Sequence, residues 1–295
     1  MIRPLGASVL IKRVSAASLT AILFVTSASA AAAAGFNPPK HYYLALGDSL
    51  AFGAQLAKFF QELGTGTYDP ATFNTGYVDD FAARMKSIDP ALQTVNLSCP
   101  AETTGSFSGT CLFRALGFAV HTDYVGSQES AALSFLGEHR GQVGPITIDL
   151  GLNDALLPCA GPTFAVDVAC VHTTMPAALQ SVAAHLPLIL AKLHAASPSS
   201  EIIVMTYFNP FYVEDHSTDS LVSAMDNEIS GIAMAQHARV ADTFVPFNAE
   251  GDETSTLCTL TLMCTPSVDY HASDAGYEVM AGRFWAASGY GRLGG

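Results

Sequence analysis

The chain has 295 residues, of which 49% are hydrophobic and only 13% are charged. This composition supports a sizeable core and excludes an intrinsically disordered chain. The formal charge of −13 disfavours nucleic acid as a partner and electrostatic docking on an anionic membrane, because both reward basic surfaces. We therefore expect a soluble globular protein that does not bind nucleic acid.

The N-terminal segment has the layout of a secretory signal peptide. Three basic residues precede the apolar stretch Val14–Val25, and an A-x-A cleavage pattern ends at Ala30. The stretch is short for a membrane span of about 20 residues, although an uncleaved anchor is the alternative. Residues 1–34 are thus predicted to be a signal peptide with its Ala-rich cleavage region. Residues 35–295 are predicted to be a single exported domain, extracellular or periplasmic, with a formal charge of −16.

Short β-rich apolar runs alternate along the chain with segments whose apolar residues recur at helical spacing. The predicted strands are Tyr42–Leu46, Thr94–Leu97, Ile146–Leu150, Ile202–Thr206 and Val240–Phe244. The predicted helices are Val78–Ile88, Glu129–His139, Ala177–Ala196 (with a kink or break at Pro187), Leu221–His237 and Ser273–Ala287. This alternation predicts a mainly parallel sheet covered on both faces, which is a three-layer α/β/α fold.

Long polar loops separate these elements, and most of the cysteines lie in or beside them. The loops are Thr103–Gly126, Leu157–Thr174 and Pro246–Val268. The simplest pairing joins cysteines that are close in sequence, and export makes disulfides chemically plausible. The predicted disulfides are Cys99–Cys111, Cys159–Cys170 and Cys258–Cys264. A zinc site is the competing interpretation, but the sequence has neither a Cys-x-x-Cys nor a His-Glu-x-x-His motif.

Four polar segments hold residue types that suit hydrolytic chemistry. Gly47-Asp48-Ser49-Leu50 follows the first predicted strand, Asn96–Thr104 the second and Gly151-Leu152-Asn153-Asp154 the third, whereas Asp269–Tyr277 precedes the last helix. Loops that follow parallel strands emerge at the same edge of a sheet, so the first three segments can converge there. A serine at such a strand end can act as a nucleophile if a base lies nearby.

Together, the four segments resemble those of the SGNH hydrolases, also called the GDSL lipase/esterase family, from about Tyr43 to about Ala287. The stretch Cys99–Thr104 is similar to the Cys-Pro-Gly-Glu-Thr-Thr segment of secreted bacterial lipases and esterases. The resemblance implies a five-stranded, flavodoxin-like α/β/α fold and a serine ester hydrolase that needs no metal or organic cofactor. The Gly-x-Ser-x-Gly signature of the larger α/β-hydrolase family does not occur in the sequence.

The same resemblance assigns a role to each candidate residue. Ser49 would attack the acyl carbonyl, His271 would accept its proton, and Asp269 would orient the histidine. The oxyanion hole would consist of the backbone N–H groups of Ser49 and Ala101 and the side-chain amide of Asn153. The implied substrate is a small-molecule or lipid ester. No obligate protein partner is expected, and we expect a monomer.

Two departures from the family pattern bear on these roles. Ala101 stands where the family has glycine, so its methyl group should reduce the space for the acyl oxygen, or restrict the turn if φ is positive. The family acid lies three residues before the histidine, a position that Val268 occupies here, and Asp269 lies two residues before His271. Either Asp269 reaches the histidine by another loop path, or a backbone carbonyl of Ser267 or Val268 orients the ring.

Other interpretations stay open on the sequence alone. A non-catalytic binding domain could retain the same fold, and a carbohydrate deacetylase could use the same machinery. The aromatic residues Phe107, Phe113 and Phe118 and the apolar loop Ala155–Pro158 would either line an acyl pocket or form core. Asp154 is expected to cap a helix.

Overall fold

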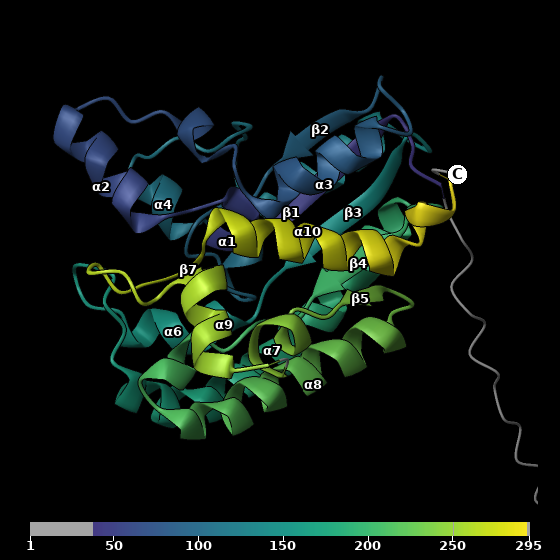
Figure 1. The fold of residues 1–295 in the computed structure, drawn as a ribbon. Coiled ribbons are helices and arrows are strands. Elements are labelled where there is room, and N and C mark those ends of the chain that lie inside the picture. The colour runs from purple at the N-terminus through teal and green to yellow at the C-terminus, as the bar shows by residue number, and fades with distance from the viewer. Residues whose placement is uncertain (1–37, 250, 294–295) are drawn as a thin grey trace, which may run out of the picture. The chain divides into compact units, whose positions relative to one another are not determined.

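A parallel sheet of five strands, in the order β2-β1-β3-β4-β5, lies at the centre of the computed structural model (Figure 1). The structure describes residues 38–249 and 251–293, which all belong to one compact unit. The predicted signal peptide, residues 1–34, lies outside the described residues. The strands are β1 (Tyr42–Gly47), β2 (Gln93–Asn96), β3 (Val143–Asp149), β4 (Ile202–Met205) and β5 (Arg239–Ala241).

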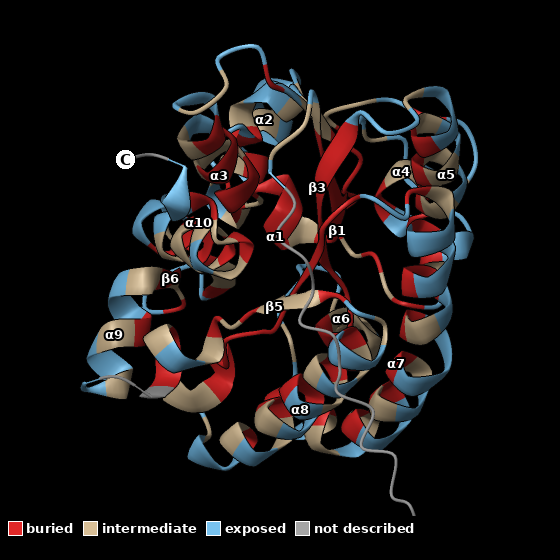
Figure 2. Cartoon of the chain, turned by 90° about the vertical axis from the view of Figure 1, so that its right-hand side faces the viewer, coloured by how far each residue is buried: buried red, intermediate tan, exposed pale blue. Residues whose placement is uncertain are grey.

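The central strands are apolar because helices cover both faces of the sheet. Every residue of β3 and β4 is buried, as are five of the six residues of β1, and Figure 2 shows these strands as the buried centre of the unit. A continuous apolar run is the pattern that a doubly covered parallel strand requires. The prediction of a three-layer α/β/α fold is confirmed.

Helices α3 and α10 pack together on one face of the sheet, and α5, α7 and α8 cover the other face (Figure 1). Shorter helices lie in the loops at the sheet edge. In chain order the helices are α1 (Ser49–Phe52), α2 (Leu56–Thr65), α3 (Tyr77–Lys86), α4 (Leu112–Ala115), α5 (Gln128–Glu138), α6 (Leu152–Leu156), α7 (Val168–Ala196), α8 (Asp219–Ala235), α9 (Glu253–Leu260) and α10 (Asp274–Ser288).

Helix α7 runs through Pro187 as one element, so of the predicted kink or break the break does not occur. A proline inside a helix costs about 3 kcal/mol, and the buried face of α7, which includes Val182, Leu186 and Leu190, offsets that cost on both sides of Pro187. By length and composition α7 could cross a membrane. It packs against α5, α6 and α8, and this core packing accounts for its apolar composition.

Several elements differ from those expected from the sequence. Strand β5 ends at Ala241 rather than Phe244, because the N–H of Thr243 donates to the side chain of Thr206 instead of continuing the ladder. Helix α9 lies within Pro246–Val268, which was expected to be a loop, and α2 was not among the predicted helices. Helix α9 buries only Leu257, so it lacks the apolar periodicity that indicates a helix in a sequence. In α2 the signal was present, because Leu56, Phe59, Phe60 and Leu63 recur at helical spacing, although only Phe59 is buried.

The order of the strands places a crevice at one edge of the sheet. The chain moves outward from β1 to β2, then crosses back to β3 and continues to β4 and β5. The connections after β1 and β3 therefore leave in opposite directions, and in open α/β sheets ligands bind at this switch point beyond the carboxyl ends of the strands.

Three disulfides stiffen the loops around that edge, and their pairing is the local one that the sequence predicts. Cys99–Cys111 joins the loop after β2 to the start of α4, and Cys159–Cys170 closes the connection from α6 to α7. Cys258–Cys264 links α9 to the hairpin of β6 (Thr261–Leu262) and β7 (Asp269–Ala272). A loop closed in this way has fewer conformations in the unfolded chain, an effect worth about 2–4 kcal/mol per disulfide.

Candidate active site

A cavity of about 160 Å³ lies at the crevice, and all five residues singled out from the sequence line it. Ser49 follows β1, Ala101 follows β2 and Asn153 follows β3, while Asp269 and His271 lie on β7. The convergence predicted for the first three segments is therefore confirmed, and the fourth segment is brought to the same cavity by the β6–β7 hairpin.

Ser49 is the first residue of α1, at a sharp turn that follows β1. Gly47 has a φ of 133°, and a Cβ atom on it would lie 1.5 Å from Oδ1 of Asp149, so a larger residue does not fit. Asp48 caps α1 by accepting a hydrogen bond from the N–H of Leu50 at 2.8 Å. This cap fixes the start of the helix, and Ser49 is thereby held partly exposed at the cavity.

A second buried carboxylate, missed in the sequence, supports this turn. Asp149 at the end of β3 accepts hydrogen bonds from the N–H groups of Asp48 at 3.3 Å and Ala51 at 3.0 Å. Burial, followed by the charge of Asp48, raises the pKa of Asp149 well above its usual range. Burial likewise raises the pKa of Asp48 to about 6, and the hydroxyl of Tyr207 donates to its Oδ2 at 3.0 Å. The available signal was an acidic residue within the mainly apolar run Ile146–Leu150 that predicts this strand.

Asp269 and His271 interact directly. Nδ1 of His271 lies 2.6 Å from Oδ1 of Asp269, and the second carboxylate oxygen accepts from the N–H of Leu56 at 2.7 Å. Residues i and i+2 of a strand point to the same side, so a spacing of two suffices on β7. Val268 has a φ of 46°, which is unusual for a β-branched residue, and this turn is the different loop path that brings Asp269 to the ring.

The electrostatics of this pair suit a histidine base. Burial lowers the pKa of His271, but the neighbouring carboxylate of Asp269 and then the charge of Asp48 raise it, and the net shift is upward. Burial raises the pKa of Asp269, whereas the contact with His271 lowers it, and the net shift is downward. The carboxylate is thus favoured in its charged form beside the ring.

Donors of hydrogen bonds converge on the cavity from the other three segments. The amide Nδ2 of Asn153 donates one hydrogen bond to the carbonyl oxygen of Glu102 at 3.0 Å, and an amide group carries a second N–H. Within the described part of the chain, no acceptor is found for the backbone N–H groups of Ser49 and Ala101. Ala101 has a φ of 63°, so alanine here occupies a conformation that favours glycine.

Asp154 does not cap α6, so this expectation is wrong. Gly151 is the N-cap, and Asp154 lies in the first turn. Its carboxylate accepts hydrogen bonds from the N–H of Thr104 at 2.9 Å and from the hydroxyls of Thr104 and Ser181 at 2.6 and 2.5 Å. The aspartate therefore joins the loop after β2 to the loop after β3 and to α7.

The rest of the cavity wall is apolar, and the sequence indicated only part of it. Phe113, Leu156 and Leu157 line the cavity as expected. Phe107 is buried in the core, and Phe118 stacks behind Phe113 with a ring separation of 4.7 Å. Other wall residues, which the sequence analysis did not single out, are Phe52, Leu56, Phe59, Phe73, Phe164, Val166 and Phe208.

Comparisons with known proteins agree on one family. The model of the GDSL-like Lipase/Acylhydrolase family matches residues 45–279. Among solved structures, an acetyl xylan esterase from Geobacillus stearothermophilus is 18% identical with a TM-score of 0.52, covering 87% of this chain and 98% of its own. An extracellular lipase from Streptomyces rimosus is 16% identical with a TM-score of 0.52, covering 83% and 99%.

A further solved structure, the lipase Lip_vut3 from a goat rumen metagenome, is 20% identical with a TM-score of 0.51, covering 85% of this chain and 99% of its own. At these identities the likeness establishes the fold. The search of curated proteins found no significant match.

Proposed function

The chain belongs to the GDSL-like Lipase/Acylhydrolase family and is a carboxylic-ester hydrolase, and we propose that Ser49 is its nucleophile and that its substrates carry apolar acyl chains. The observation that carries the proposal is the shared cavity, which Ser49, Asn153 and the Asp269–His271 pair line together with an apolar wall.

In the first half of the proposed reaction, Ser49 Oγ attacks the acyl carbonyl carbon and its proton passes to Nε2 of His271. Asp269 holds Nδ1, so Nε2 is the nitrogen that faces the reaction, and the carboxylate stabilises the imidazolium that forms. The negative oxygen is met by the N–H groups of Ser49 and Ala101 and by the amide of Asn153. The alcohol then leaves with the proton from His271, and an acyl-serine remains.

In the second half, a water molecule attacks the acyl-serine. His271 takes the proton of this water and returns it to Ser49 Oγ as the carbonyl–Oγ bond breaks, and the carboxylic acid is released. The same donors stabilise the second oxyanion, so one site serves both steps.

The cavity wall favours a lipid or other apolar acyl ester over an acetylated sugar. Eight Phe and Tyr side chains line the cavity in addition to aliphatic ones: Phe52, Phe59, Phe73, Phe113, Phe164, Tyr207, Phe208 and Tyr270. A wall of this kind gains free energy by removing acyl methylene groups from water, about 0.8 kcal/mol for each. A carbohydrate needs convergent polar groups that can bind it. The polar side chains at this cavity that take no part in the proposed reaction, Asp48, Gln55, Tyr207 and Tyr270, are hydrogen-bonded within the protein.

We also propose that the protein is exported. The three disulfides are typical of proteins that fold in an oxidising compartment, and residues 1–34 have the layout of a signal peptide.

The test combines covalent labelling with a substrate series. A fluorophosphonate should label the wild-type protein once, at Ser49, and p-nitrophenyl esters of increasing chain length should be cleaved faster than the acetate and than an acetylated xylo-oligosaccharide. Ser49→Ala should lose labelling and nearly all turnover, and only the small residual rate supplied by substrate binding and the oxyanion hole should remain. Absence of both labelling and turnover would favour a non-catalytic domain, and a preference for the acetylated sugar would favour a carbohydrate deacetylase.

A further inference from the structure

Gln128, the first residue of α5, makes an unusual contact with the strand that precedes the proposed nucleophile. Its side chain is fully buried. Oε1 accepts a hydrogen bond from the N–H of Gly47 at 2.6 Å, and Nε2 donates to the carbonyl oxygen of the same residue at 3.0 Å. The side-chain amide thus binds both backbone groups of Gly47, which lies two residues before Ser49.

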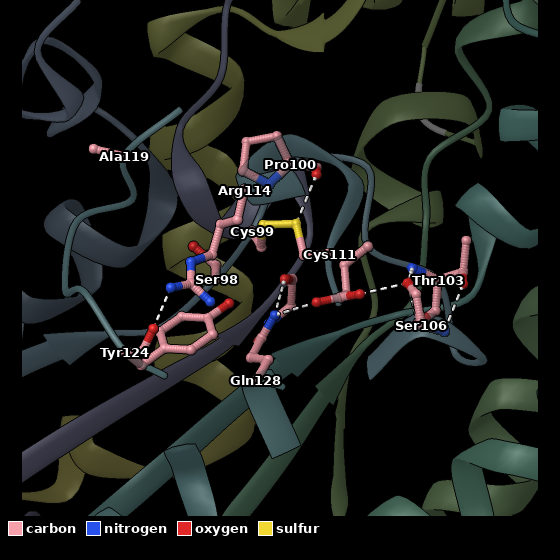
Figure 3. The surroundings of a disulfide bond; sticks show 12 residues. Ser98, Cys99, Pro100, Thr103, Ser106, Cys111, Arg114, Ala119, Tyr124 and Gln128 are labelled. Atoms are coloured by element: carbon pink, nitrogen blue, oxygen red, sulfur yellow. Dashed lines mark hydrogen bonds between the residues drawn. A yellow bond between two sulfur atoms is a disulfide. The ribbon is translucent and has the colours of Figure 1, made fainter. Parts of the chain in front are cut away.

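The same amide also reaches the loop that follows β2. Nε2 of Gln128 donates to Oε2 of Glu102 at 3.0 Å, and the hydroxyl of Ser106 donates to Oε1 of Glu102 (Figure 3). Glu102 is fully buried and is the neighbour of Ala101 in the chain. Both carboxylate oxygens are therefore held by donors from the protein.

A third link runs from Glu102 to the loop that follows β3. The backbone carbonyl of Glu102 accepts the hydrogen bond from Nδ2 of Asn153 at 3.0 Å. One continuous path, from Gly47 through Gln128 and Glu102 to Asn153, therefore joins the loops after β1, β2 and β3. Each proposed oxyanion donor belongs to this path or lies within two residues of it.

We propose that Gln128 and Glu102 are positioning residues that hold the three loops of the oxyanion hole at a fixed separation. The inference rests on the proposed function, because it concerns the same hydrolytic site. Neither residue touches the cavity, and Gln128 comes from a helix outside the four sequence segments, so it acts through Gly47 and Glu102.

We call the hydrogen-bonded pair Gln128–Glu102 the brace, and the physical reason for it is preorganisation of the oxyanion donors. An oxyanion donor is effective only at about 2.7–3.1 Å from the oxygen that becomes negative, and a displacement of about 1 Å can cost 10²-fold in rate. The three loops begin at different strands, β1, β2 and β3. The buried side-chain amide of Gln128 is hydrogen-bonded to the first two and resists their separation, because breaking these hydrogen bonds would leave unpaired buried polar groups. Burial raises the pKa of Glu102, hydrogen bonds from Ser106 and Gln128 lower it, and the net pKa is about 7. The carboxyl group is therefore present here although its burial is unfavourable.

Two variants test the brace. Gln128→Met keeps the length of the side chain but removes its donor and acceptor, and Glu102→Leu removes both acceptors. We expect each to lower kcat on a short p-nitrophenyl ester by about 10- to 100-fold with little change in KM. Glu102→Gln can still accept from Gln128 and donate to Ser106, so it should retain kcat to within about threefold.

Glu129→Gln is the matched control, because Glu129 is the next residue of α5 and its carboxylate pairs with Lys192 of α7, which is not part of the path. It should leave kcat unchanged. A wild-type kcat in Gln128→Met, a loss confined to KM, or a fall in thermal stability without a fall in kcat at a temperature where the variant is folded would overturn the proposal. Equal losses in Glu102→Gln and Glu102→Leu would also overturn it.

An NMR measurement separates this inference from the proposed function. The short bond from Gly47 should shift its amide proton downfield, and Gln128→Met should move that signal upfield. The side-chain amide signals of Asn153, which does not touch Gln128, should move in the same variant. If the wild-type protein lacks esterase activity but both signals respond, the proposed function fails and the brace stands. Signals of Asn153 that do not respond would refute the brace.

Discussion

At the scale of single residues, the charge relation between Asp269 and His271 predicts a pH dependence. The general base must be neutral, and the pKa of His271 is raised above 6.5 by Asp269 and Asp48 despite burial. Activity should therefore fall as the pH drops through a value above 6.5. Asp269→Asn should reduce kcat by about 10³–10⁴-fold, because the imidazolium loses its partner, and should move the acid limb of kcat/KM to lower pH.

The measurement is a pH–rate profile of both proteins on one soluble ester, with circular dichroism to confirm folding. A near-wild-type rate for Asp269→Asn would contradict the triad and leave a Ser–His dyad.

Asn153 gives a second prediction at this scale. Its amide is held by the carbonyl of Glu102 at 3.0 Å, so in the proposed mechanism its remaining N–H would be preorganised to meet the oxyanion. Asn153→Ala should lower kcat by about 10²–10³-fold and leave KM nearly unchanged, because charge develops on the oxygen only in the transition state. Steady-state kinetics decide the point, and a change in KM alone would make Asn153 a ground-state contact.

At the scale of elements, the disulfide-closed segment between α6 and α7 forms one wall of the cavity. Cys159–Cys170 closes it, and Ala160 pairs with Val166 across it. Phe164 lies at its tip with a φ of 62°, and its ring packs against the rings of Phe59 and Phe60 on α2, at 6.2 and 6.4 Å. A phenylalanine in the left-handed region carries strain that its packing offsets.

Phe164→Gly should lengthen the acyl chain that the enzyme prefers. Glycine accepts the backbone conformation without strain, so the variant removes the side chain and leaves the turn intact. The ratio of kcat/KM for long over short p-nitrophenyl esters should rise by about three- to tenfold, the scale of a small change in an apolar pocket. Leu63→Ala, an exposed change on α2 outside the cavity wall, should leave the ratio unchanged. An unchanged ratio in Phe164→Gly would remove this residue from the acyl site.

At the scale of the whole molecule, several buried carboxyl groups have raised pKa values, and burial is the first cause in each. The pKa is raised to about 6 for Asp48, to about 7 for Glu102 and Glu201, and well above the usual range for Asp149 and Asp226. The native state therefore binds protons more tightly than the unfolded chain, and linkage requires its stability to rise as the pH falls from about 7 toward the unfolded values near 4.

The expected outcome is a higher Tm at pH 5.5 than at pH 8, measured by calorimetry in buffers of equal ionic strength. His271 acts in the same direction, because a raised pKa adds stability that is lost as the pH rises through it. Groups whose pKa is lowered in the native state oppose the trend, and His121 and Asp269 are two of them. Burial lowers the pKa of His121, so its charging below about 6.5 costs stability, and Asp269 loses its stabilising charge only below about 4. A Tm that falls between pH 8 and pH 5.5 would contradict the prediction.

Much of the fold, and the outline of the candidate site, is determined by short-range patterns in the sequence. The buried strands are apolar runs, and the helices on the sheet faces, such as α8 and α10, have their apolar residues at helical spacing. Each segment can therefore be predicted as strand or helix from the sequence alone. Gly47-Asp48-Ser49 and Gly151-Leu152-Asn153 lie at strand ends, and parallel strands place such ends at one edge. The local disulfides follow from closeness in sequence.

Only the tertiary structure decided the contacts between segments that are far apart in the chain. Asp269 can hydrogen-bond to His271 because the turn at Val268 and strand β7 place both side chains on the same side of the strand. No local sequence pattern specifies this course of the backbone. Asp149 and Gln128 lie in a buried strand and at the start of a surface helix, and their importance comes from partners about 100 and 81 positions away. Such contacts depend on how the elements pack. A hydrogen bond between residues far apart in the chain leaves no periodic pattern in the sequence from which it could be predicted.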